Sequence, residues 1–476
     1  MMSISTPLTR RYFLYESALG LGSCALASLV RGSRVRAAPL LSHSVPSTAP
    51  VAHFVPRARN VIFLFMAGGP SQLELFDYKP SLRTYEGQTV PQSVLGDQEL
   101  PFIERDSTLM ASPLRFSRHG ESGAQLSEVL PGLAEVVDDL AIIRSVHTDA
   151  FNHAPAQIFL HTGHLQHGKP SMGSWISYGL GSDSADLPSF IVLTPGGGVS
   201  GGATCYGNGF LPSIYQGVPL RSEGDPILFV GDPAGIDRRM QQQTIETLSQ
   251  LNRYRSRISG DSEITARIKA YEMAFRMQAS APELIDLAQE SEATFRLYGA
   301  TPGESSFASS CLLARRLVER GTRFVEILYR GWDHHSDVAG GIRKMCEKAD
   351  RPVAALIKDL SQRGLLDDTL VIWGGEFGRT PMVENNPALG RSRGRDHHPN
   401  AFAMWLAGGG VKSGQTIGQT DELGYHVVQD PVHVHDLQAT ILYLLGLEHT
   451  ELTFFHQGRD FRLTDVGGEV VEKLIA

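Results

Sequence analysis

Uninterrupted apolar runs recur along the chain, and glycine or polar residues close each of them. The first, Asn60 to Met66, reads NVIFLFM and is closed by Gly68-Gly69-Pro70. Runs without polar alternation are typical of parallel strands that are buried on both faces of a sheet. Buried strands are therefore predicted here and at residues 140–146, 190–193, 323–329, 369–373 and 401–406.

Helical patterns precede several of these strands. Residues 309–320 end at Gly321 and residues 352–363 end at Gly364, and glycine commonly follows the last turn of a helix. Helix, turn and buried strand in alternation indicate an α/β fold with a doubly wound, mostly parallel sheet and helices on both faces. Residues from about 237 to 298 are polar and rich in Gln, Arg and Glu, which predicts an α-helical insertion on this core.

The N-terminus has the pattern of an export signal. Arg10-Arg11 is followed by Phe13-Leu14 and by a weakly apolar run at residues 18–30. This order resembles a twin-arginine signal, and the run is too short and too rich in Gly, Ser and Ala to span a membrane. We therefore expect no transmembrane anchor in the mature chain and a periplasmic or extracellular location. The expected segments are a signal peptide at 1–38, a linker at 39–57 and one domain at 58–476.

The composition narrows the function classes. A net charge of −8 without a concentrated charged tail argues against nucleic acid as a partner. Of the four cysteines, Cys24 lies in the expected leader. The sparse, odd set that remains argues against a disulfide framework and against a thiolate metal cage, although one disulfide stays open. Cys24 also ends a lipoprotein-like box, Leu21-Gly22-Ser23-Cys24, which falls too early in the apolar run to be preferred.

Polar residues directly after the strands are candidates for chemistry, because ligands bind beyond the carboxyl ends of strands in open parallel sheets. Asp333 and His335 follow the strand at 323–329. A carboxylate and a neutral imidazole at one strand end can converge on a zinc or manganese ion. The alternative is a solvated loop in which His334, His335 and Asp337 are merely polar.

Two further stretches carry charge beside predicted strands. Glu376 and Arg379 follow the strand at 369–373, and they can face a metal and an anion respectively. An ordinary surface ion pair is the alternative. Residues 391–399 combine three arginines with histidines before the strand at 401–406. They would create a positive field around a bound oxyanion, or they form an exposed basic loop.

Polar residues also gather within residues 145–163, just before a predicted helix N-terminus. Such a terminus suits an oxyanion or a nucleophile, because its backbone N–H groups are unpaired. A simple N-cap by Asn152 is the alternative.

Several of these motifs together resemble one family over nearly the whole chain, the family called domain of unknown function 1501. Its pattern includes a twin-arginine leader and motifs of the types Gly-Gly-Pro-Ser, Gly-Trp-Asp-x-His, Glu-Phe-Gly-Arg-Thr-Pro and Gly-Arg-Asp-His. The resemblance is specific for the family and much less specific for a reaction. The matching stretches are Arg10-Arg11, Gly68 to Pro80, Gly331 to His335, Gly374 to Pro381 and Gly394 to His397.

The wider relatives of that family are alkaline phosphatases and sulfatases, so the resemblance implies a sheet of the alkaline phosphatase/sulfatase type. In alkaline phosphatases, an Asp, a nearby His and a distant His hold one metal. Asp333, His335 and His397 resemble that set.

The other half of the superfamily site departs from the pattern. Where sulfatases carry Asp-Asp after the first strand, this chain has Gly68-Gly69, so Gln72 and Asp77 would have to replace the pair. Where the superfamily has Asp-His after a middle strand, Glu376 keeps only the carboxylate. The sulfatase nucleophile pattern aligns with His153, so no formylglycine can form and a standard sulfatase mechanism is excluded.

These residues lead to the hypothesis of an exported, metal-dependent hydrolase of phosphate or sulfate esters, acting on a small molecule or a glycan. The divalent ion is expected to be zinc or manganese, with calcium and magnesium left open. It would activate a water by lowering the pKa of that water, in place of the missing nucleophile. The expected ligands are Asp333, His335, His397, Glu376 and Asp77.

The remaining candidates serve the substrate. His153 would act as general acid and base, or as a nucleophile that forms phosphohistidine. Arg379 and Arg395 would neutralise the oxyanion charge that develops in the reaction. Substrate contacts are expected from Asn152, Gln72, His334 and His398.

Two other function classes stay open. The chain can be a non-catalytic protein that retains the fold and binds an anionic glycan or a cell-surface partner, since a fold does not guarantee chemistry. It can also hold a metal that only stabilises the fold. The oligomeric state is left open as well.

Overall fold

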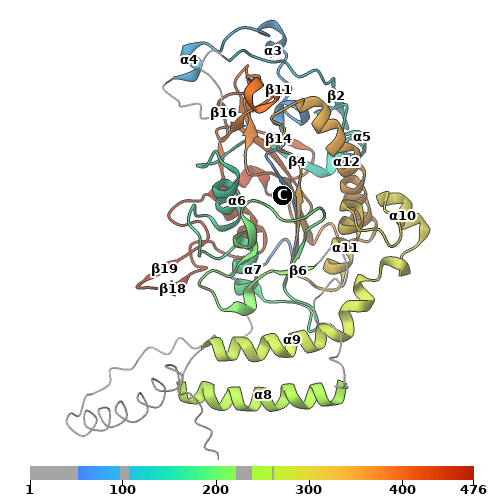
Figure 1. Cartoon of the computed structure of the whole chain (residues 1–476), viewed down its shortest axis with the longest axis vertical. Coiled ribbons are helices and arrows are strands. Elements are labelled where there is room, and N and C mark those ends of the chain that lie inside the picture. Colours follow the sequence, from blue (N-terminus) through green and yellow to red (C-terminus); the bar gives the residue numbers. More distant parts are fainter. Residues whose placement is uncertain (1–51, 97–106, 221–237, 260–261) are drawn as a thin grey trace, which may run out of the picture. The chain divides into compact units, whose positions relative to one another are not determined.

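Figure 1 shows the computed structural model of the chain, which describes residues 52–96, 107–220, 238–259 and 262–476. The expected signal peptide and most of the expected linker lie outside the described residues. Among the described residues, no helix combines the length and the apolar character needed to cross a bilayer.

A central sheet organises the chain, with strand order β14-β4-β13-β8-β1-β7-β5-β6 and β17 beside β4. The strand β1 lies in the middle and pairs in parallel with β7 and β8. Each buried strand predicted from the apolar runs is present within a residue of its predicted bounds. The sheet strands are β1 (Asn60–Ala67), β4 (Leu140–His147), β5 (Phe190–Leu193), β6 (Val218–Leu220), β7 (Phe324–Arg330), β8 (Thr369–Gly374), β13 (Phe402–Ala407), β14 (Gln415–Ile417) and β17 (Val432–His433).

One strand of the sheet reverses the parallel pattern. The strand β13 pairs antiparallel with both β4 and β8. An antiparallel strand begins at the edge where its parallel neighbours end. Residues just before β13 therefore lie at the same edge as the loops that follow β1, β4, β7 and β8.

Helices cover both faces of the sheet, and the alternation of side chains along β1 divides the core between them. Ile62, Leu64 and Met66 pack in one cluster with α5, α11 and α12. Val61, Phe63 and Phe65 pack in the other cluster with α6, α7 and α13. These helices are α5 (Pro131–Ala134), α6 (His153–Thr162), α7 (Met172–Leu180), α11 (Phe307–Glu319), α12 (Val338–Gln362) and α13 (Val434–Leu444).

The helix α12 begins earlier than its sequence pattern predicts. The prediction started at Pro352, because proline favours the first turn of a helix. In the structure Pro352 lies inside the helix. The preceding half supplies its own start, where the Asp337 side chain accepts a hydrogen bond from the Gly340 backbone.

Shorter elements surround the edge of the sheet at which the parallel strands end. They include α2 (Gln72–Leu75), α3 (Ser81–Thr84), α4 (Gln92–Leu95), β2 (Phe116–His119), β3 (Ala124–Ser127), β9 (Gly378–Arg379), β10 (Glu384–Asn386), β11 (Arg391–Gly394), β12 (His397–His398), β15 (Gln419–Thr420) and β16 (Val427–Gln429). The two-stranded ribbon of β18 (Phe454–His456) and β19 (Arg459–Phe461) follows α13.

The predicted helical insertion is occupied by three helices, α8 (Arg238–Ser259), α9 (Ser262–Ile285) and α10 (Glu292–Tyr298). The first two pack against each other, with Glu272 of α9 contacting Ser249 and Arg253 of α8. Residues 221–237, which lead into α8, lie outside the described residues.

Candidate metal centre

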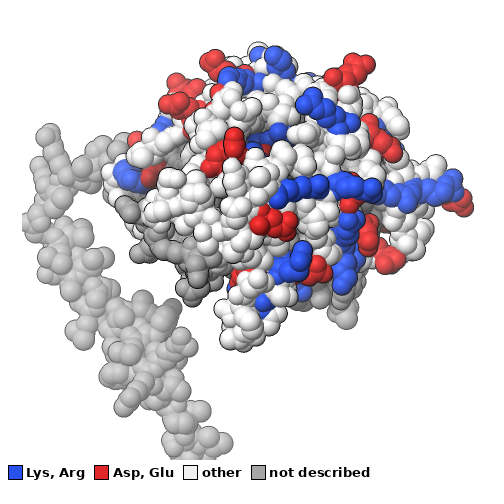
Figure 2. Space-filling model, turned by 90° about the horizontal axis from the view of Figure 1, so that it is seen from above, with Lys and Arg blue, Asp and Glu red and all other residues white. Residues whose placement is uncertain are grey.

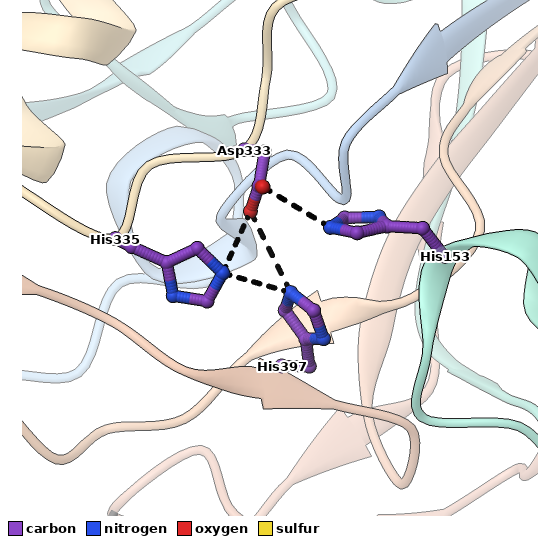
Figure 3. Close-up of side chains that lie close together, drawn as sticks. All are labelled: His153, Asp333, His335 and His397. Carbon is purple, nitrogen blue, oxygen red and sulfur yellow. Dashed lines mark hydrogen bonds and ion pairs between the residues drawn. The ribbon is translucent and has the colours of Figure 1, made fainter. Parts of the chain in front are cut away.

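Four side chains from distant parts of the sequence meet at the edge of the sheet (Figure 3). They are His153, Asp333, His335 and His397, and one ligand atom from each lies within 4.8 Å of all the others. His153 opens α6 after β4, Asp333 and His335 follow β7, and His397 in β12 precedes β13. The reversed direction of β13 brings His397 to the edge where β4 and β7 end.

The carboxylate of Asp333 is the centre of this group. Its Oδ1 atom lies 3.0 Å from Nε2 of His335 and 3.5 Å from Nε2 of His397. Its Oδ2 atom lies 3.2 Å from Nε2 of His153. The two Nε2 atoms of His335 and His397 are 3.1 Å apart. All three imidazoles therefore present the same ring nitrogen to one carboxylate.

The opposite ring nitrogens are held by oxygen atoms. Nδ1 of His153 lies 2.7 Å from Oε1 of Glu376, and Nδ1 of His397 lies 2.9 Å from the carbonyl oxygen of Phe151. Nδ1 of His335 bonds to the carboxylate of Glu384. An Nδ1–H that donates to oxygen leaves a lone pair on Nε2, which is how metal-binding histidines are commonly oriented.

A divalent metal fits this donor set. Three Nε2 lone pairs and a carboxylate would repel one another without a cation or protons between them. Nε2 of His153 is buried, and it faces Oδ2 of Asp333 at 3.2 Å. Histidine nitrogen and carboxylate oxygen are the ligands that zinc and similar ions take in proteins.

The electrostatics keep Asp333 ionised and His397 neutral, while His153 is held protonated at neutral pH. Burial raises the pKa of the Asp333 carboxyl, but hydrogen bonds from the three histidines and the charge of Arg379 outweigh it and hold that pKa far below its usual range. Burial lowers the pKa of His397 to about 4, assisted by Arg379, so its ring is neutral at pH 7. Burial also lowers the pKa of His153, but Asp333 and Glu376 outweigh it and raise that pKa to about 9.

Glu376 orients the cluster without joining it. Its side chain is fully buried and accepts hydrogen bonds from the backbone N–H groups of Gly68 at 3.0 Å and Gly69 at 3.2 Å. It also accepts from Nε2 of Gln157 at 2.9 Å, besides its bond to His153. With every oxygen engaged, Glu376 supports His153 and is not placed as a direct metal ligand.

The glycine pair after β1 is required by this packing. Gly68 and Gly69 have φ values of 123° and 66°, and residues with a side chain rarely adopt such a backbone conformation. A Cβ atom on Gly68 would lie 2.5 Å from the backbone nitrogen of Asp333. A carboxylate at position 68 would displace the loop that carries Asp333, and one at position 69 would collide with the ring of Phe377.

The family model described as protein of unknown function (DUF1501) matches residues 58–475. The chain belongs to the DUF1501 family. No curated protein matches this DUF1501 chain.

Solved structures that resemble this DUF1501 protein include a synthase, a hydrolase and a phosphatase. The lipoteichoic acid synthase LtaP from Listeria monocytogenes is 9% identical, with a TM-score of 0.36 over 86% of this chain and 76% of that one. Phosphonate monoester hydrolase SpPMH from Silicibacter pomeroyi is 13% identical, with a TM-score of 0.33 over 85% and 76%. A mutant TAB5 alkaline phosphatase with bound magnesium is 10% identical, with a TM-score of 0.34 over 83% and 99%. TM-scores below 0.5 at these identities support no conclusion about activity.

Two arginines expected to bind the oxyanion are engaged elsewhere in the DUF1501 protein. Arg379 is 1% exposed, and its guanidinium donates to the carbonyls of Gly68, Gly69 and Arg395 and, at 2.7 Å, to Oδ1 of Asp333. Arg395 is fully buried, where it donates to both oxygens of Glu74 and to backbone carbonyls. Both guanidinium groups are therefore saturated by the protein and are not placed to contact a substrate.

The expected ligand Asp77 also lies outside the converging set. Its carboxylate accepts from the hydroxyl of Thr420 and lies 3.1 Å from Nζ of Lys79. Gln72 bonds the backbone N–H and C=O of Arg379, each at 2.8 Å, so it fixes a loop and does not face a ligand.

The other expected substrate contacts have structural partners or lie beside the cluster. Asn152 is exposed and caps α6, its Oδ1 accepting from the His153 backbone at 2.8 Å. Nε2 of His398 is 2.6 Å from the carbonyl of Tyr425, and burial lowers the pKa of His398 to about 4. Burial and Arg379 lower the pKa of His334 to about 4 as well, and its half-buried ring packs on Gly341.

Three partners of the cluster were not foreseen from the sequence. Gln157 lies one helical turn after His153, so its place on the same face of α6 could have been deduced. Glu384 and the carbonyl of Phe151 carry no such signal. The loop after β8 brings Glu384 to the cluster, and the loop after β4 brings the carbonyl of Phe151 there.

Replacing Glu376 with Gln tests its orienting role. The amide nitrogen would face backbone N–H donors, so we expect the loop to shift and metal affinity to fall about 10- to 100-fold. Titration of zinc and of manganese against a chromophoric chelator measures this, with circular dichroism to verify folding. The matched control is Glu135→Gln on the surface, which should bind like the wild type. Equal affinities for E376Q and wild type would contradict the assignment.

Replacing Arg395 with Ala separates a structural role from substrate binding. The variant leaves Glu74 buried and unpaired, so unfolding free energy should fall by about 3–5 kcal/mol. Urea denaturation measures the loss, and the neighbouring exposed Arg393→Ala provides the control. Unchanged stability together with weaker oxyanion binding would restore Arg395 as a substrate residue.

Proposed function

We propose that this DUF1501 protein is an exported, metal-dependent hydrolase of phosphate or sulfate esters. The observation that carries the proposal is the convergence of three Nε2 atoms on Asp333, with each opposite Nδ1 held by oxygen. A bound divalent ion would act as a Lewis acid toward an ester oxygen and lower the pKa of a water molecule. We assign Asp333, His335 and His397 as its ligands, with zinc or manganese favoured by the nitrogen donors.

His153 is the residue we assign to proton transfer. Its Nδ1 is anchored to Glu376, and its Nε2 lies 3.2 Å from Oδ2 of Asp333. A carboxylate that fixes one ring nitrogen of a histidine leaves the other aimed at a reacting group, as in catalytic dyads. His153 would deliver a proton from Nε2 to the leaving oxygen. Alternatively, once deprotonated, it would attack phosphorus from that atom while the bond from phosphorus to the leaving alcohol breaks, and water would then hydrolyse the phosphohistidine.

The open side of the cluster is where an ester would enter. The Asp333 side chain is 42% exposed and that of His153 is 17% exposed, whereas that of His397 is 5% exposed. His153 also opens α6, whose first backbone N–H groups favour a negatively charged group nearby. An anionic ester approaching His153 meets both features.

Arg330 is our candidate for contacting the anionic group, because Arg379 and Arg395 are saturated. It ends β7 and is exposed, and within the described residues its guanidinium makes no hydrogen bond or ion pair. The guanidinium carbon lies 3.4 Å from where a Cβ on Gly197 would stand, in the loop after the neighbouring strand β5. Arg330 is thus held over a glycine loop at the edge of the sheet that carries Asp333.

The substrate class we propose is a small-molecule or glycan ester, and nucleic acid is not expected. The chain has a net charge of −8. On the face seen in Figure 2, basic and acidic side chains lie interspersed. Arg10-Arg11 and the run that follows motivate the proposal that the protein acts in the periplasm or outside the cell.

A second function is favoured by one observation. Within the described residues, the buried guanidinium groups of Arg379 and Arg395 beside the cluster are bonded to the protein itself. This arrangement also suits a non-catalytic protein that binds an anionic glycan. Such a protein would bind sulfated glycans without turnover, and binding would survive loss of Asp333.

The central test removes the metal and its ligand together. Protein stripped by chelation and reloaded with zinc, manganese, calcium or magnesium is assayed on phosphate monoesters and diesters, phosphonate esters and sulfate esters, including sulfated glycans. Turnover should depend on the metal and should be lost in Asp333→Ala, which also loses the ion by elemental analysis. His167→Ala, an exposed histidine, is the control. If adding zinc or manganese to the stripped protein leaves its turnover unchanged, the proposal is wrong.

Replacing Arg330 with Ala should raise KM for an anionic ester about 10- to 100-fold, the range for a lost hydrogen bond to a charged group, with kcat and metal content kept. Steady-state kinetics measure the split, and Arg330→Lys should recover part of the loss. Arg118→Ala, on the exposed strand β2, is the control. A fall in kcat with KM unchanged would contradict the assigned role.

A further inference from the structure

The helix α8 exposes a row of large apolar side chains. Met240 is 50% exposed, Leu251 54%, Tyr254 64% and Ile258 70%. At about 100° of rotation per residue, Met240, Leu251 and Ile258 lie within about 20° of one direction, and Tyr254 within about 40° of Met240 and Ile258. We call these four residues the α8 stripe.

The α8 stripe lies opposite the side of α8 that packs on α9. Ser249 is 4% exposed and lies 3.5 Å from Glu272, and Arg253 contacts the same carboxylate at 3.3 Å. Ser249 is nine residues after Met240, which corresponds to half a turn away from the stripe. The exposure of the stripe therefore follows from the helix pair itself.

Positive charge accompanies the stripe. The helix carries five arginines and one acid, Glu246. Arg253 pairs with Glu272 and Arg238 lies over the Phe275 ring, whereas Arg239 and Arg257 lie beside the stripe. Arg239 and Arg257 lie on the same side of the stripe, about 100° from its direction. A surface that covers the stripe must therefore offer both an apolar layer and negative charge beside it.

The charges argue against a second copy of the chain as the occupant. Parallel pairing of two α8 helices would place Arg253, Arg255 and Arg257 beside their own copies. Antiparallel pairing would place Arg255 and Arg257 beside Arg238 and Arg239 of the other copy. Both arrangements bring like charges together, which is destabilising.

A bilayer with anionic phospholipids offers both requirements at once, along the whole helix and without a matching register. Helices of low mean hydropathy with a narrow apolar face and flanking arginines lie in the interface plane of such membranes. Tyrosine is enriched at that depth. We propose that α8 is a membrane-surface helix through which the protein docks peripherally on anionic phospholipid bilayers.

The test uses the full chain with vesicles of phosphatidylglycerol mixed with phosphatidylcholine, and with vesicles of phosphatidylcholine alone. Co-sedimentation should show binding to the anionic vesicles that weakens with salt. Each of Arg239→Ser and Arg257→Ser should weaken binding about fivefold. The double variant Leu251→Glu, Ile258→Glu should remove the contribution of the stripe.

The controls change equally exposed residues elsewhere. Leu389 and Val466 are 63% and 86% exposed, so Leu389→Glu and Val466→Glu add the same charges outside the helix pair. They should bind vesicles like the wild type. All variants carry the same N-terminal segment, so differences between them report on α8.

A local readout makes the result independent of any other membrane contact. Leu251→Cys in a Cys24→Ser background places one reactive thiol on the stripe, because Cys205, Cys311 and Cys346 are buried. A fluorophore attached there should shift its emission to the blue with anionic vesicles only. No shift, equal binding to both kinds of vesicle, or a dimer dispersed by the double Glu variant would each overturn the proposal. Capture of an acidic protein without vesicle binding would overturn it too.

Discussion

The buried carboxylate of Glu376 is the interaction on which the candidate site depends. It accepts from the loop after β1 through Gly68 and Gly69, and from α6 through Gln157 and His153. Burial raises the pKa of a carboxyl, but the bonds from His153 and Gln157 outweigh it and lower the pKa of Glu376. One ionised group thus ties together three segments: the loop after β1, the start of α6 and the loop after β8, which carries Glu376 itself.

The direction of β13 is the second constraint. Loops after parallel strands can place Asp333, His153 and Glu376 at one edge, but a fully parallel strand would place His397 at the other. Because β13 pairs antiparallel with β4 and β8, the residues before β13 lie at the edge of the sheet where β4 and β8 end. The short pair β9 and β12 then holds His397 opposite Arg379. Topology therefore determines which histidine joins the cluster.

The sequence was sufficient for six strands of the central sheet, whereas the short strands β6, β14 and β17 and the partners within the site were not predicted. Apolar runs mark buried strands because burial on both faces leaves no polar alternation, and the motifs beside these runs marked Asp333, His335, His397 and His153. Arg379 and Arg395 were assigned to a substrate because guanidinium groups near a site usually bind anions. Their burial against Gly68, Gly69 and Glu74 depends on loop packing, which local sequence does not encode. Predicted segments before residue 52 lie outside the described residues.

The distribution of charge around Asp333 indicates the side from which an ester can act. Oδ1 faces Arg379 at 2.7 Å, His335 at 3.0 Å and His397 at 3.5 Å, all from groups that the protein holds in place. Oδ2 faces only His153 among the described cluster residues, and the carboxylate is partly exposed. Arg379, His335 and His397 all lie on the Oδ1 side, so Oδ2 is left to His153. On the proposed function, an anionic ester would bind beside His153, because a pKa of about 9 leaves that ring protonated at neutral pH and the N-terminus of α6 also favours negative charge.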